Sequence, residues 1–77
     1  MKGKVIEGII GEVEKEGYRV VKVINEADRV SFILEDSLTR REVEALCDTL
    51  YWKGIPAKPF GIPAGYKRGF HIKKPLL

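Results

Sequence analysis

The stretch YRVVKVINEADRVSFILE, residues 18–35, predicts two strands joined by a short turn. β-Branched and aromatic residues, which favour strands, make up most of its first part, from Tyr18 to Ile24. The polar residues 25–28 have the length of a hairpin turn. Val30, Phe32 and Leu34 then alternate with Arg29, Ser31 and Glu35, which is typical of a strand buried on one face. The two strands are therefore expected to pair antiparallel.

The first of these strands carries apolar residues on both faces. Strict alternation places Tyr18, Val20 and Ile24 on one face, and Val21 and Val23 on the other. Apolar residues on both faces are typical of a strand inside a sheet. We therefore expect this strand to have a neighbour on each side.

The segment after the hairpin carries the clearest helix signal of the chain. Thr39 and Glu42 have the spacing of a capping box, in which each side chain accepts a hydrogen bond from a free backbone N–H. Leu38, just before the cap, stands at the position of a hydrophobic staple. The core stripe of the helix is predicted at Val43, Leu46, Cys47 and Leu50. Gly54 and Pro56 predict its end.

The first 17 residues allow two interpretations. Apolar residues at positions 5, 6, 9, 10 and 13 fill one arc of a helix, and Gly17 stands where that helix would end. Gly8 and Gly11 weigh against a helix, since each costs about 1 kcal/mol relative to alanine in a helix interior. A β-hairpin that turns at Glu16 and Gly17 is the alternative. We favour the helix, because the apolar positions do not alternate.

A last short strand is predicted from Gly69 to Lys73, where Phe70 and Ile72 share one face. The element order is then helix, strand, strand, helix, loop, strand. This order predicts an α+β fold with a small antiparallel three-stranded sheet and two helices on one of its faces. The 77 residues are expected to form a single domain, with a Gly/Pro-rich basic segment at 54–70. An open sheet edge could pair with a second copy of the chain.

Composition excludes several classes of site. Cys47 is the one cysteine and His71 the one histidine, so neither an intramolecular disulfide nor a Cys/His zinc cluster can form. Cys47 lies on the core stripe, so we expect it to have a packing role rather than that of a nucleophile. No Gly-rich phosphate loop or carboxylate metal motif is present, so we expect no metal, no cofactor and no enzymatic activity.

Hydropathy and composition also bear on where the protein works. No apolar run approaches the about 20 residues that cross a bilayer, and no signal peptide is visible. We therefore expect a cytoplasmic protein that does not enter membranes. The chain has no Gln and one Asn beside many charged residues, which is typical of thermophilic proteins.

The positive charge is concentrated in the last third of the chain. Residues 1–48 hold eight Lys and Arg against eleven Asp and Glu, whereas residues 49–77 hold six Lys and Arg and no acid. Aromatic rings interleaved with cations favour single-stranded nucleic acid, because bases stack on rings while cations meet phosphates. We therefore predict binding of single-stranded nucleic acid with little sequence preference. The predicted contacts are Lys58, Phe60, Tyr66, Lys67, Arg68, Phe70 and His71, with Lys73 and Lys74 adding phosphate neutralisation.

Other interpretations stay open. The lysines can serve only to solvate the surface or meet an acidic protein, with Phe70 and Ile72 in the core. Trp52 points away from the core stripe of its helix and is the candidate contact of a protein-interaction or homodimerisation module. We favour the interpretation in which the proline-rich segment folds back and covers Trp52.

Overall fold

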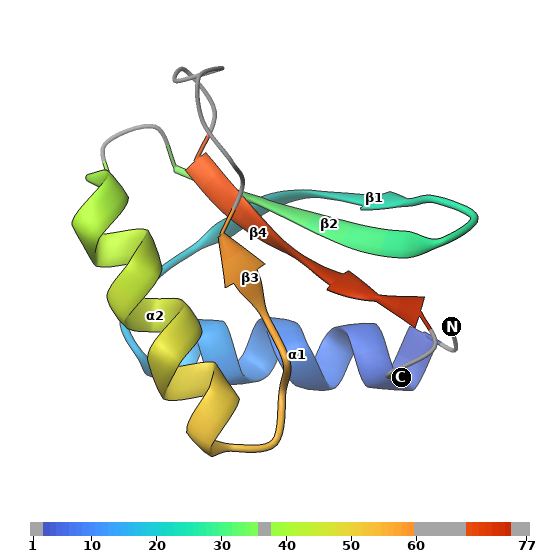
Figure 1. Cartoon of the computed structure of the whole chain (residues 1–77), viewed down its shortest axis with the longest axis horizontal. Helices are drawn as coiled ribbons and strands as arrows, with labels where there is room; N and C mark the ends of the chain where they lie inside the picture. The colour runs from blue at the N-terminus through green and yellow to red at the C-terminus, as the bar shows by residue number, and fades with distance from the viewer. Residues whose placement is uncertain (1–2, 36–37, 60–67, 75–77) are drawn as a thin grey trace.

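The computed structural model describes residues 3–35, 38–59 and 68–74. They form two helices and four strands, shown in Figure 1. In chain order these are α1 (Gly3–Lys15), β1 (Val20–Asn25), β2 (Arg29–Leu34), α2 (Arg40–Trp52), β3 (Lys58–Pro59) and β4 (Arg68–Lys73). The strands form one antiparallel sheet in the order β1-β2-β4-β3. The predicted α+β class and antiparallel hairpin are confirmed, but the predicted number of three strands is wrong.

The strand that the sequence did not predict is β3, which lies in the proline-rich segment. Lys58 pairs with His71 and Pro59 pairs with Phe70 of β4. Two residues are too few to show the alternation that identifies a strand. One of them is a proline, which has no N–H to donate and is found mainly in edge strands.

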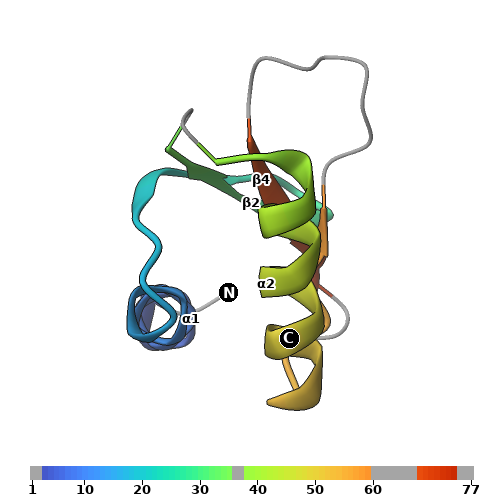
Figure 2. The same cartoon turned by 90° about the vertical axis from the view of Figure 1, so that its left-hand side faces the viewer.

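Both helices pack on the same face of the sheet, which we call the inner face (Figure 2). Its central contact is between Phe32 and Phe70, whose rings stack with their centroids 4.9 Å apart. Around them lies a core of Ile9, Val13, Val30, Leu34, Val43, Leu46, Cys47, Leu50, Ala57 and Ile72. The opposite face of the sheet, which neither helix covers, is called the outer face below.

The helical interpretation of the N-terminal segment is confirmed, and the hairpin alternative is wrong. Ile9 and Val13 of α1 are buried in the core. The chain leaves α1 through Gly17, whose φ of 90° is a conformation that side chains disfavour. Hydrogen bonds from Gly17 N to Glu14 O (2.9 Å) and from Tyr18 N to Val13 O (3.3 Å) complete this end of the helix.

Both predicted ends of α2 are confirmed. Thr39 Oγ1 accepts from Glu42 N at 3.1 Å, and the Glu42 carboxylate accepts from Thr39 N at 2.8 Å, which completes the capping box. At the other end Gly54 has a φ of 85°. Ile55 N donates to Leu50 O at 2.9 Å, and Gly54 N donates to Tyr51 O at 3.0 Å, the pair of bonds of a Schellman motif.

The expectation that the first strand has two neighbours is wrong, because β1 is an edge strand. A register shift between Val20 and Lys22 breaks the alternation. Val20 and Val23 consequently both face the inner side, opposite Leu34 and Phe32. Ile24 is opposite Ser31 on the outer face. A β-bulge adds one residue and reverses the facing of everything after it, so strict alternation misassigned this strand.

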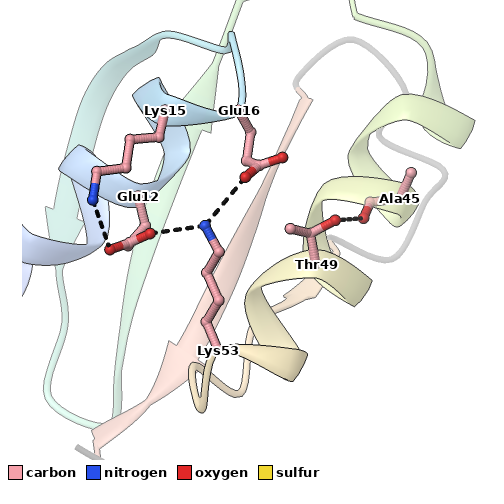
Figure 3. A network of polar contacts seen from close by, with 6 residues as sticks. All are labelled: Glu12, Lys15, Glu16, Ala45, Thr49 and Lys53. Atoms are coloured by element: carbon pink, nitrogen blue, oxygen red, sulfur yellow. Dashed lines mark hydrogen bonds and ion pairs between the residues drawn. The ribbon is translucent and has the colours of Figure 1, made fainter.

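Lys53, just after α2, connects the two helices (Figure 3). Its Nζ lies 2.8 Å from Glu12 Oε1 and 3.1 Å from Glu16 Oε2. Lys15 Nζ lies 3.6 Å from the other oxygen of Glu12. The hydrogen bond from Lys53 and the charge of Lys15 lower the pKa of Glu12, and the two carboxylates raise the pKa of Lys53. The charge of Lys53 is thus offset within the helical layer.

Candidate nucleic-acid interface

Alternation along β4 divides its residues between the two faces of the sheet. Phe70 and Ile72 are fully buried on the inner face, opposite Phe32 and Val30 of β2. His71 and Lys73 lie between them in sequence and therefore on the outer face. The segment that looked uniformly basic and aromatic in the sequence thus supplies one set of side chains to the core and another to the surface.

Strand register brings basic residues from all four strands onto the outer face. Directly paired residues point to the same side of a sheet. One row across the sheet runs through Ile24, Ser31, His71 and Lys58. The next row of the outer face on one side contains the pair Arg29 and Lys73, and the next row on the other side contains the pair Lys22 and Ile33. Lys22, Arg29, Lys58 and Lys73 are all exposed.

No Asp or Glu occurs among the strand residues that the structure describes. Two carboxylates, those of Glu26 and Asp28, lie in the turn between β1 and β2. Glu26 Oε1 accepts from Arg29 Nε and from Ser31 Oγ, both at 3.3 Å. The outer face is therefore a surface of net positive charge with a small acidic contribution at one end.

His71 lies at the centre of this charge. Burial lowers the pKa of His71 most, and the positive charges of Arg29, Lys58 and Lys73 lower it further. Asp28 acts in the opposite direction. The imidazole is consequently held neutral near pH 7, surrounded by three cations that come from three different strands.

The outer face ends in a pocket beside the turn of the hairpin. It is lined by Ala27, Asp28, Arg29, His71, Lys73 and Lys74. Lys74 N donates to Asp28 O at 3.0 Å, which ties the end of β4 to this turn. The pocket therefore rests on paired strands and brings several cationic side chains together.

The predicted contact residues divide into four groups. Lys58, His71 and Lys73 lie on the outer face, and Lys74 lines the pocket at its end. Arg68 is partly buried, and its Nε donates to Leu38 O at 2.9 Å, so its guanidinium holds the segment before α2. Phe70 is fully buried, which corrects the expectation that its ring offers a stacking surface. The predicted contacts outside the described residues are Phe60, Tyr66 and Lys67.

Sequence reasoning missed the cations of the hairpin. Lys22 and Arg29 belong to the first part of the chain, where acidic residues outnumber basic ones, so the overall composition of that part did not point to them. Their strands contain no acid, and this signal could have been found by counting charge strand by strand. The sheet order places Arg29 on β2 directly beside β4 and Lys22 on β1 one strand further away, and the sequence pattern did not provide this order.

Comparison with known proteins adds no relative. The chain matches no protein-family model, no curated protein and no solved structure. The interpretation of the outer face therefore depends on its own geometry.

Trp52 lies apart from this face, at the end of α2. It is 84% exposed, which corrects the expectation that the proline-rich segment covers it. Tyr51 beside it is 65% exposed, and the two rings meet edge to face with centroids 6.1 Å apart. Two neighbouring exposed aromatic side chains form a second surface that differs in chemistry from the outer face of the sheet.

Cys47 is buried in the core, as predicted. Burial, with the nearby charges of Asp48 and Glu44, raises the pKa of its thiol to about 12. Because the thiolate is the reactive form, this cysteine is inert near neutral pH.

Within residues 3–35, 38–59 and 68–74, no group of three His, Cys, Asp or Glu side chains could hold a metal ion. No helix in the same part of the chain is long and apolar enough to cross a membrane.

Proposed function

We propose that this protein binds single-stranded nucleic acid, with little sequence preference, on the outer face of its sheet. The observation that supports the proposal most is the strand register, which places Lys22, Arg29, Lys58 and Lys73 on the same face of the sheet. The described strands contribute no Asp or Glu to this face. Contacts between cations and phosphates supply affinity that does not depend on sequence. Neither helix of the part of the chain that the structure describes lies on this face, which leaves room there for an extended strand.

The side chains between the cations suit bases better than a purely basic surface would. Ile24 and Ile33 are half-buried on the outer face, and the ring of His71 lies among the cations. Imidazole rings can stack on unpaired bases, and apolar side chains can contact their faces. The outer face therefore combines phosphate contacts with a limited apolar platform.

The test is an NMR titration of the ¹⁵N-labelled protein with a mixed-sequence single-stranded oligonucleotide at low and high salt. We expect shifts in the amides of β1, β2 and β4 that fade as salt rises, because binding releases counterions from the phosphates. Inorganic polyphosphate of matched charge is the control for general polyanion binding. An absence of shifts at low salt would refute the proposal. Equal affinity for polyphosphate would reduce it to polyanion binding.

A protein-contact surface at Trp52 is the second candidate function, supported by the exposure of Trp52 and Tyr51. Exposed tryptophan and tyrosine are frequent among the residues that dominate interfaces. Pairing of sheet edges is a weaker route to a homodimer, since the bulge in β1 and Pro59 in β3 both disfavour strand addition. Sedimentation of the wild type and of Trp52→Ala tests this candidate. A wild-type chain that stays monomeric at all concentrations would remove its homodimer form.

A further inference from the structure

The pocket at the end of the outer face has the composition of an anion site. Three of its six residues are the cations Arg29, Lys73 and Lys74, and His71 adds a ring that can gain a proton. Asp28 contributes the one carboxylate. With His71 neutral, the formal charge of these residues is about +2, and Glu26, whose Oε1 lies 3.3 Å from Arg29 Nε, lowers the local charge to about +1. A net positive charge suits a phosphate carrying one or two negative charges.

The framework of the pocket is the sheet itself. Arg29 and Lys73 are directly paired across β2 and β4, so their side chains project from the same side at neighbouring positions. Lys74 is held by its backbone bond to Asp28 O, and Glu26 N donates to Arg29 O at 2.9 Å across the turn. The backbone positions of these cations are fixed by strand pairing, so only their side chains need to reorder when an anion binds.

The neighbouring groups differ in what they offer to a phosphate. A guanidinium such as that of Arg29 can donate two parallel hydrogen bonds to phosphate oxygens, whereas a lysine acts as a compact charge. Asp28 lines the same pocket and repels an anion, so it reduces the attraction that the three cations exert. The pocket thus differs from the open part of the outer face, where cations are spread over separate rows.

We propose that this pocket binds one phosphate group of the nucleic acid strand that lies on the outer face. This inference rests on the proposed function. The phosphate is either the monoester at a strand end or a diester within the strand, because both present negatively charged non-bridging oxygens to the three cations, three in the monoester and two in the diester. The pocket then sets where along the sheet the strand begins or passes the hairpin turn.

Inorganic phosphate is the first probe, followed in ¹⁵N spectra by strands with a 5′-phosphate, a 3′-phosphate or neither. We expect inorganic phosphate to shift the amides of residues 27–29 and 71–74 and to leave those of β1 unchanged. A preference for one phosphorylated end identifies the monoester as the ligand. Equal shifts of these amides with all three strands identify a diester. Both outcomes support the site.

Two substitutions that should change the affinity for phosphate in opposite directions make the test sharper. Lys73→Ala should weaken phosphate binding by about two- to fivefold, the range of single exposed charge contacts. Asp28→Asn should strengthen it, since it removes a repulsive charge and leaves the backbone bond to Lys74 in place. Lys22→Ala is the matched control for the binding of inorganic phosphate, which it should leave unchanged, because it removes a lysine from the same face but outside the pocket.

The outcomes separate this inference from the proposed function. If strands shift the amides of β1 and β2 while residues 27–29 and 71–74 stay silent, the phosphate site is refuted and nucleic-acid binding stands. The same follows if Lys73→Ala and Lys22→Ala weaken phosphate binding equally. If phosphate binds but no strand binds at any salt concentration, the proposed function fails, and this inference fails with it.

Discussion

The two faces of the sheet are built from the same strands, yet they do different physical work. On β4, Phe70 and Ile72 are fully buried beneath the helices, whereas His71 and Lys73 lie among cations on the opposite side. Successive residues of a strand point to opposite faces, so neighbours in sequence can differ completely in surroundings. A basic and aromatic segment should therefore be divided by face before a function is assigned to it.

The largest effect is expected from the inner face. Phe70→Ala removes a ring that stacks on Phe32 and leaves a cavity, so the free energy of unfolding should fall by about 3–5 kcal/mol. Denaturant unfolding measures this change. Val21→Ala, at an exposed apolar position of the edge strand, is the control and should change stability by less than about 0.5 kcal/mol. If Phe70→Ala kept full stability but lost nucleic-acid binding, the division between the two faces would be wrong.

The next effect concerns binding through the outer face. The double variant Lys58→Ala/Lys73→Ala should reduce the slope of log affinity against log salt by about 1.4, since each lost phosphate contact of a single strand contributes about 0.7. Lys4→Ala/Lys15→Ala on α1 makes the same change in net charge on the helical layer and should leave the slope unchanged. Fluorescence anisotropy with a labelled strand over a range of salt concentrations measures both. Equal slopes for the two variants would mean that net charge, and not the outer face, governs binding.

A smaller effect is expected in the titration of His71. In the free protein, burial and three cations lower the pKa of His71, so it takes up its proton below its usual range near 6.5. Bound phosphates offset those cations and should raise the pKa of His71. Affinity should consequently increase as the pH falls through the usual histidine range.

Ring-proton NMR of His71, with and without an oligonucleotide, measures this shift. The stability of the free protein changes with pH in the opposite direction to the binding affinity. The unfolded chain binds the proton more readily, so the contribution of His71 to stability is present above its usual pKa and is lost as the pH falls. Lys58→Ala should raise the pKa of free His71 because it removes one of the cations. An unchanged pKa on binding would place the strand away from this ring.

Local signals in the sequence predicted most of the fold. The capping box at Thr39 and Glu42, the glycine stop at Gly54 and the alternation over β2 each depend on a few neighbouring residues, and the structure confirms all three. The bulge near Val20 and the two-residue strand at Lys58 were missed. Both arise from pairing with a distant strand, and they leave little trace in local periodicity.

The candidate site was predicted less completely, for the same reason. Lys58, His71 and Lys73 were chosen from composition and lie on one face, but Phe70 was chosen with them and lies in the core. Arg29 was missed because it is between 29 and 44 residues away from these positions in the chain. Only the register of β2 against β4 brings it to Lys73.

The smallest effect on binding is expected from substitution of Lys53. This residue tests whether binding depends on the lysine content of the last third of the chain or on the face where each lysine lies. Lys53 belongs to the basic last third of the chain, yet Glu12 and Glu16 already offset its charge across the helices. Lys53→Gln should therefore leave the salt slope unchanged, whereas Lys58→Gln on the outer face should reduce it by about 0.7. The pKa of Glu12 is lowered mainly by its bond with Lys53, so the stability from this pair is present above the usual carboxylate pKa and lost as the pH falls. Lys53→Gln should flatten that acidic dependence of thermal unfolding without affecting binding. If it weakened binding as much as Lys58→Gln, the lysine content of the last third would matter more than the face on which each lysine lies.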